Sequence, residues 1–127
     1  KKGDLMVAIV GATIGQVSVY QNDREANINQ AIALIRLGEQ VNSEYAKEFL
    51  YSKIGQIQLD RIKRPVARAN INLDEVGSLQ IIYPSKDKQN EMVGKIRKIR
   101  ARATELRQEA ENIVTGAEKK IEQMILA

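Results

Sequence analysis

The sequence predicts an α+β protein in which a small, mixed, β-rich domain with short helices precedes one long, coiled-coil-forming α-helix. Three observations predict this class. Up to Pro84, short apolar runs alternate with Gly and Asn residues, which is typical of short strands and turns. From Ser85 onward proline is absent and glycine is rare. There the apolar residues recur at intervals of four and three, the spacing of a coiled-coil helix. We therefore expect domains over residues 1–84 and 85–127.

The first predicted element is a β-hairpin. Residues 5–10 form a continuous apolar run, as in a buried strand. The segment GATIG follows, and residues 16–19 then alternate polar and apolar side chains, as in a half-buried strand. This order predicts two strands joined by a turn with residues 12–14 at its tip. It disfavours a dinucleotide-binding loop, because a helix must follow that loop's glycines to present free N–H groups to phosphate.

The next elements are a third strand and a helix. Residues 28–37 indicate a strand with an arginine near its end. Asn42 or Ser43 is suited to cap a helix over residues 43–53, because short polar side chains accept hydrogen bonds from the first N–H groups of a helix. Gly55 is suited to end that helix.

The remainder of the first region is less regular. The segment QIQLDRI, residues 56–62, fits either a short helix or a strand. Asn72 is suited to cap a helical turn that runs to residue 76. Residues 79–83 indicate a last strand, which Pro84 ends.

The second region predicts one helix with a narrow apolar stripe. From residue 92 to 124 this helix is about 50 Å long at 1.5 Å per residue. Such a stripe has to be buried against another helix, and the repeated alanines at one heptad position allow a close approach of the partner backbone. One extra interval of four after residue 117 is a stutter that relaxes the supercoil. The stripe, called the seam below, consists of Met92, Ile96, Ile99, Ala103, Leu106, Ala110, Ile113, Ala117, Ile121 and Met124.

Charge is distributed unevenly. The net charge is +4, and residues 1–84 carry ten basic against nine acidic side chains, whereas residues 85–127 carry ten against seven. A basic cluster lies in the first half of the long helix, at positions 95, 97, 98, 100 and 102. It fits either a solvated flank of a coiled coil or a contact with phosphates or an acidic partner.

Catalytic chemistry is restricted by composition. The sequence has no cysteine and no histidine, which removes thiol nucleophiles, Cys/His zinc sites and a Ser-His dyad. No strand-borne acidic cluster points to a nuclease. We therefore expect no active site, no metal site and no cofactor in this chain.

One loop has a composition suited to DNA. Residues 61–72, RIKRPVARANIN, carry four basic side chains and no acidic one, followed by two asparagines. Arginine and asparagine read guanine and adenine edges, and lysine and arginine hold phosphates. A solvated loop whose arginines pair with the acidic helix over 43–53 explains the composition equally well. The candidate DNA contacts are Thr13 and Gln16 on the hairpin, and Arg61, Lys63, Arg64, Arg68 and Asn70 in the loop.

Several segments, taken in order, resemble the specificity subunit of type I restriction–modification enzymes. They are KKGDLMVAIVGATIGQVSVY, NQAIALIRL, VNSEYAKEFLYSKIGQIQL and NINLDEVGSLQIIYPSKDKQNEMVGKI. Their shared features are a Gly-Asp before an apolar strand, a Gly-x-x-x-Gly hairpin, a Tyr-x-x-x-Phe-Leu helix and Pro-x-x-x-x-Gln opening a long helix.

The resemblance implies a function. In that family a target recognition domain reads one half of a split double-stranded DNA sequence. The long helix packs antiparallel against a counterpart, from the same subunit or a second copy. Such a subunit is non-catalytic and docks methyltransferase and restriction subunits, and S-adenosylmethionine, ATP and Mg²⁺ are used only by those partners. Further sequence precedes the Gly-Asp strand in the family, so we expect this chain to be part of a longer one.

Two other interpretations remain open. The chain could be the specificity region of a fused restriction–methyltransferase enzyme, or a coiled-coil assembly module that binds protein and not DNA. No apolar run approaches the roughly 20 residues of a membrane span, and the lack of cysteine fits a cytoplasmic protein. The RPVARA loop differs from the Gly/Ser-rich loop of the family, so its DNA contacts are inferred from residue chemistry alone.

Overall fold

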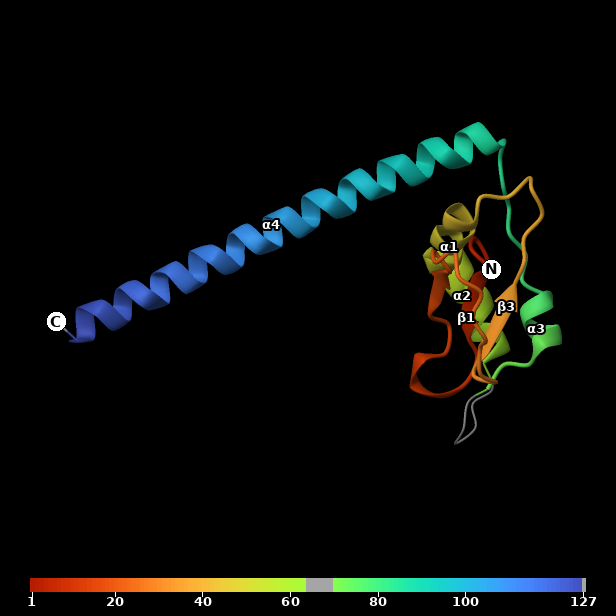
Figure 1. The fold of residues 1–127 in the computed structure, drawn as a ribbon, viewed down its shortest axis with the longest axis horizontal. Helices are drawn as coiled ribbons and strands as arrows, with labels where there is room; N and C mark the ends of the chain where they lie inside the picture. Colours follow the sequence, from red (N-terminus) through yellow and green to blue (C-terminus); the bar gives the residue numbers. More distant parts are fainter. Residues whose placement is uncertain (64–69, 127) are drawn as a thin grey trace. The chain divides into compact units, whose positions relative to one another are not determined.

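The computed structural model describes residues 1–63 and 70–126. The chain divides into two compact units, Lys1–Val93 and Gly94–Ala127. The first, called the globular unit below, holds a small sheet and three short helices, and the second is the greater part of the long helix α4 (Lys86–Leu126) (Figure 1). The predicted α+β class is confirmed. None of the helices in the described ranges is both long and apolar enough to cross a membrane.

The sheet has three antiparallel strands in the order β2-β1-β3. Strand β1 (Leu5–Ala8) is central, and β2 (Val17–Val19) and β3 (Ile32–Ile35) pair with its two edges. Alternate residues of these strands point into the core, because successive side chains of a strand face opposite sides. The core is built from Leu5, Val7, Ile9, Val17, Ala33, Ala46, Leu50, Leu59, Ile71 and Val76.

The predicted hairpin is confirmed. Strands β1 and β2 are joined by a turn that contains the short 3-10 helix η1 (Gly11–Thr13). Gly11 and Gly15 have φ of 82° and 86°, a region that side chains with a Cβ rarely adopt. The backbone of Gly15 donates to the carbonyl of Ala8 at 3.0 Å, so the turn is closed by a strand-like bond.

Helices α1 (Ser43–Tyr51) and α2 (Lys53–Ile62) are separated by one residue. Asn42 is the N-cap of α1, as predicted, and its side chain accepts from the backbone of Glu44 at 2.8 Å. The prediction that Gly55 ends this helix is wrong. Ser52 ends α1 and caps α2, and the segment QIQLDRI is helical. Gly55 lies inside α2, where it is buried.

The last predicted strand is also wrong. Residues 79–83 follow the short helix α3 (Leu73–Gly77) and form no strand. The side chain of Gln58 occupies the place of a strand partner, because its amide donates to the carbonyl of Gln80 at 3.0 Å and accepts from the backbone N–H of Gln80 at 2.9 Å. The predicted cap of α3 is confirmed, since Asn72 and Glu75 form a capping box.

The first turns of α4 are fastened to the globular unit by one buried amide. The side chain of Gln89 is fully buried. It accepts from the backbone of Asn42 at 2.8 Å and donates to the carbonyls of Gln40 and Pro84 at 3.0 and 2.8 Å. Both N–H groups and the oxygen of this buried amide therefore have hydrogen-bond partners. The loop that Gln89 holds follows β3, the third strand that the sequence predicts.

The Gly-Asp pair ahead of β1 is a structural device. Asp4 is buried, and Arg36 donates to its two carboxylate oxygens at 2.8 and 2.6 Å. These hydrogen bonds from Arg36 hold the pKa of Asp4 well below its usual range. The ion pair between Asp4 and Arg36 joins the start of β1 to the end of β3, which explains why an aspartate precedes β1.

Candidate nucleic-acid interface

Three segments that are far apart in the sequence meet at one end of the sheet. The hairpin turn follows β1, and the residue that begins β3, Ile32, pairs with the last residue of β1, Ala8. Just beyond β1, Val10 forms a β-bridge with Asn70. We call this place the hairpin end; it comprises residues 11–16, 28–31, Lys63 and Asn70. In Figure 1 the turn, the start of β3 and the chain at residue 70 lie at the same end of the globular unit.

The two hairpin residues predicted to contact DNA are exposed. Thr13 is in the 3-10 turn and Gln16 follows Gly15, immediately before β2. The backbone of Gln16 donates to the carbonyl of Thr13 at 3.0 Å, which fixes the spacing of the two side chains. Both line a shallow groove of about 310 Å³ on the outer face of the sheet, with Met6 and Tyr51 among its walls.

Tyr51 fixes the hairpin to the helices. Its hydroxyl donates to the carbonyl of Val17 at 2.8 Å and accepts from the N–H of the same residue at 3.0 Å. Because Tyr51 is the last residue of α1, strand β2 and the turn before it are held against a helix and not only by the sheet. A rigid support of this kind places Gln16 at a defined position, which base recognition requires.

Lys63 brings a positive charge to the hairpin end. If residue 15 carried a Cβ atom, that atom would lie 3.3 Å from the Nζ of Lys63. The lysine side chain therefore lies against the turn. Its ammonium also pairs with Asp60 at 2.8 Å. A pair of this kind at a surface is worth about 1 kcal/mol at most, so a phosphate can compete for Lys63.

The other predicted loop residues are distributed differently. Asn70 is exposed beside the hairpin, through its bridge with Val10. Arg61 lies two residues before Lys63, and such residues point in nearly opposite directions from a helix. It lines a separate groove with Ile57 and Ile82. Arg64 and Arg68 lie outside the described residues. The DNA contacts of all these residues stay predictions.

Two polar residues at the hairpin end were missed by the sequence analysis. Asn29 and Gln30 were included in the predicted strand over 28–37, but β3 begins at Ile32. Asn29 instead makes a turn, because its Oδ1 accepts from the backbone of Ala31 at 3.0 Å, and this leaves Gln30 exposed. The signal for this turn was the run Asn-x-Asn-Gln, whose residues favour turns over strands.

The seam of α4 is a second surface that the sequence analysis singled out. Most of its large members are exposed, with Ile99 by 69%, Ile113 by 66% and Met124 by 80%, whereas Ile96 is half-buried. Residues from 95 to 126 are nearly all exposed in this way. Burial against another helix therefore stays a prediction for this surface.

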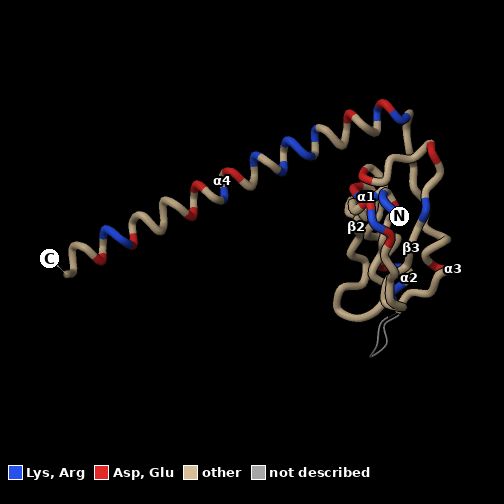
Figure 2. The backbone as a smooth tube through the Cα atoms, viewed as in Figure 1, with Lys and Arg blue, Asp and Glu red and all other residues tan. Residues whose placement is uncertain are grey.

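Basic and acidic residues are unevenly distributed along α4. Figure 2 shows basic segments succeeding one another early in the helix and acidic ones more often later. Arg102 pairs with Glu105 at 3.2 Å on the helix surface. In the described ranges, 1–63 and 70–126, the structure brings together no group of three acidic side chains that could hold a metal ion.

Comparisons with known proteins identify the family of this chain. The family model for the type I restriction modification DNA specificity domain matches residues 1–115. A curated relative, the specificity subunit of the type I restriction enzyme EcoBI from Escherichia coli, is 28% identical over 128 residues. The match covers 100% of this chain and 27% of the relative. The chain thus spans about a quarter of the length of that relative.

Proposed function

Because the chain belongs to the family of type I restriction modification DNA specificity domains, we propose that it reads one half of a bipartite double-stranded DNA target. The observation that carries this proposal is the hairpin end, where exposed amide and hydroxyl groups and the half-buried ammonium of Lys63 come together from separate segments of the chain. The globular unit does the reading, and α4 holds it at a fixed distance from the domain that reads the other half.

The groups at the hairpin end match the chemistry of base edges. A glutamine or asparagine amide donates to and accepts from adenine in the major groove, and a threonine offers a hydroxyl or its methyl group. Gln16, Gln30 and Asn70 are of this kind, and Thr13 is beside them. Lys63 supplies a charge for a phosphate, a contact that fixes orientation without reading sequence.

Antiparallel pairing of α4 follows from the order of large and small residues along the seam. When Ala103 lies opposite Leu106 of an antiparallel copy, Ile99 lies opposite Ala110 in the same register. Met92 likewise lies opposite Ala117, so a large side chain meets a small one in three of the four pairs, and only Ile96 and Ile113 meet as two large residues. In a parallel pair in register, alanine would face alanine and leave space. A helix of the same subunit with a similar pattern would pair in the same way.

The role includes partners that carry out catalysis. We expect this chain to bind DNA and to dock methyltransferase and restriction subunits, while S-adenosylmethionine, ATP and Mg²⁺ act in those partners. This role implies a cytoplasmic location. The specificity region of a fused restriction–methyltransferase enzyme would use the same surfaces, and methyltransferase motifs preceding it in the native chain would identify that case.

Replacing Lys63 by alanine is expected to reduce the salt dependence of DNA binding. Loss of one phosphate contact lowers the slope of log K against log salt by about 0.9. The measurement is fluorescence anisotropy of a labelled duplex at several salt concentrations. Lys63 is the C-cap of α2, and alanine keeps the backbone hydrogen bond that it makes there. The variant loses the surface ion pair with Asp60, which is worth about 1 kcal/mol at most, so the fold is expected to persist.

Lys53 provides the matched control for this experiment. It carries the same charge on the same helix, about 15 Å from Lys63 at the rise of an α-helix. Lys53→Ala is expected to leave the slope unchanged. An unchanged slope in Lys63→Ala, or an equal decrease in both variants, would contradict a phosphate contact at the hairpin end.

A further inference from the structure

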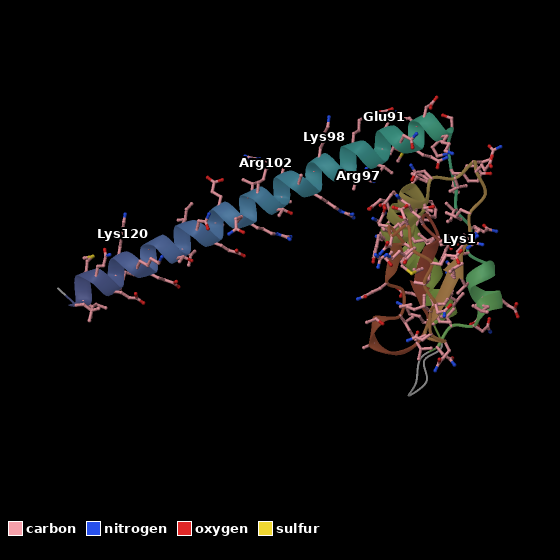
Figure 3. The ribbon with its side chains drawn as sticks, in the orientation of Figure 1. Lys1, Glu91, Arg97, Lys98, Arg102 and Lys120 are labelled. Carbon is pink, nitrogen blue, oxygen red and sulfur yellow. The ribbon has the colours of Figure 1, made fainter. Side chains whose placement is uncertain are left out.

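The basic cluster of α4 consists of two stripes that differ in what accompanies the positive charges. Residues three and four apart share a face of a helix. One stripe contains Lys95, Lys98 and Arg102, and the other contains Arg97, Arg100 and Arg107. In Figure 3, Lys98 and Arg102 leave the helix on one side and Arg97 on another. We call the second set, together with Thr104, the arginine stripe.

The first stripe is balanced by acidic residues on the same face. Glu105 follows Arg102 and pairs with it at 3.2 Å, and Glu91 and Glu109 lie further along the same row. An approaching anion would meet carboxylates as well as cations. This stripe therefore has the composition of a solvated coiled-coil flank.

The arginine stripe has no carboxylate between Arg97 and Arg107. Residues 97, 100, 104 and 107 follow the spacing three, four, three, and Glu111 is the first acidic residue further along the row. All four side chains are exposed. The Thr104 hydroxyl at present donates to the carbonyl of Arg100 at 3.0 Å, a local bond that an acceptor outside the helix can replace.

The dimensions of the stripe fit an extended polyanion. Arg97 and Arg107 are about 15 Å apart along the helix axis. Each strand of DNA carries one negative charge per about 3.4 Å of its axis, so the stripe runs beside about four phosphates of one strand. Arginine and threonine are both frequent phosphate donors.

An acidic partner helix fits the stripe less well. With alanines at heptad position a, Arg100 and Arg107 fall at position e, beside the seam, but Arg97 and Thr104 fall at position b. Side chains at b point away from the seam, so a helix that covers the seam cannot reach them. A ligand that engages all four residues must lie along the side of α4.

We propose that the arginine stripe, Arg97, Arg100, Thr104 and Arg107, binds the phosphate backbone of double-stranded DNA without regard to sequence. The inference rests on the proposed function, because that function supplies DNA as the polyanion. It assigns DNA binding to a helix whose expected role in the family is only to space the recognition domains and to pair with another helix.

The test compares two double variants that remove equal charge from the same segment of α4, residues 97–107. One is Arg97→Gln with Arg107→Gln, and the other is Lys98→Gln with Arg102→Gln. Glutamine has nearly the helix propensity of arginine and lysine, so both variants are expected to keep the helix, which circular dichroism checks. The probe is a random-sequence duplex, and the salt dependence of its affinity is measured by anisotropy. A third variant, Arg97→Lys with Arg107→Lys, retains the charge.

The first variant is expected to lower the log–log salt slope by about 1.8, for two lost phosphate contacts. The second is expected to change the slope much less, and the lysine variant to preserve it. Equal decreases in the first two variants would show a general effect of net charge and overturn the proposal. An unchanged slope accompanied by loss of helix pairing would also overturn it, in favour of an acidic helix. If Lys63→Ala leaves the salt slope unchanged while Arg97→Gln with Arg107→Gln lowers it, the result contradicts the phosphate contact at the hairpin end and supports the one at the arginine stripe.

Discussion

Replacing Gly55 by alanine is expected to destabilise the globular unit by about 3 kcal/mol or more, because the added Cβ would collide with backbone atoms. It would lie 2.4 Å from the Cα of Leu50 and 2.4 Å from the carbonyl oxygen of Phe49. Backbone atoms cannot turn aside as a flexible side chain can, so α1 and α2 would have to separate. For a domain with a total stability of roughly 5–15 kcal/mol, this is a large loss.

The close approach at Gly55 results from the one-residue connection between α1 and α2. Ser52 donates from its backbone to Glu48 and Phe49 at 3.0 Å each and, through its side chain, accepts from Gly55 at 3.3 Å. Any larger residue at 55 would disturb this junction. Since Tyr51 ends α1 and Lys63 is the C-cap of α2, the attachment of Tyr51 to β2 and the position of Lys63 at the hairpin end depend on this junction.

Gly94 supplies the control for this substitution. It lies within α4, and a Cβ added there meets nothing within 4 Å. Gly94→Ala is expected to stabilise the helix by about 1 kcal/mol through intrinsic propensity. Denaturant unfolding followed by circular dichroism measures both variants. A Gly55→Ala variant as stable as the parent would contradict the close packing of α1 and α2.

Replacing Leu106 by glutamate is expected to weaken pairing of α4 by at least about 100-fold, or nearly 3 kcal/mol. Leu106 is one of the large seam residues and lies near the middle of the antiparallel register described above. Burying a carboxylate without a partner, and losing a buried leucine, each cost several kcal/mol. In the absence of another partner helix, the unmodified chain is expected to self-associate through the seam.

Sedimentation at high micromolar concentration measures this pairing. Gln108→Glu is the control, because it adds a charge to the same turn of α4 on the side away from the seam. It is expected to leave association unchanged. An unmodified chain that remains entirely monomeric under these conditions would count against the seam as a self-pairing surface.

The elements predicted correctly are those specified by local sequence. The seam spacing, the absence of proline and the Asn42 cap act over a few residues, so the long helix and the start of α1 could be predicted from pattern alone. The hairpin could also be predicted from local sequence, since Gly11 and Gly15 adopt positive φ in the turn and alternating polar and apolar residues follow them.

The wrong predictions concern residues whose conformation depends on distant parts of the chain. Gly55 looked like a helix end, but its lack of a side chain serves the contact between α1 and α2. Residues 79–83 have the composition of a strand, yet their partner is the side chain of Gln58, 22 residues earlier. No periodicity in the sequence reports either contact.

The candidate site was predicted only in its local part. Thr13, which lies between the two glycines, and Gln16, which follows the second, were assigned to the hairpin from local sequence. Their proximity to Gln30, Lys63 and Asn70 requires the strand order β2-β1-β3 and the bridge at Val10. These are long-range pairings, which sequence spacing does not encode.

The most direct test of DNA reading by the hairpin end is selection from a pool of randomised duplexes at low salt. The chain is expected to enrich a short sequence with defined bases at several positions, and Gln16→Ala is expected to relax the preference at one of them by about 1–3 kcal/mol. Retention of duplexes without enrichment at any position would contradict sequence reading. Absence of retention altogether would instead favour an assembly module that binds protein.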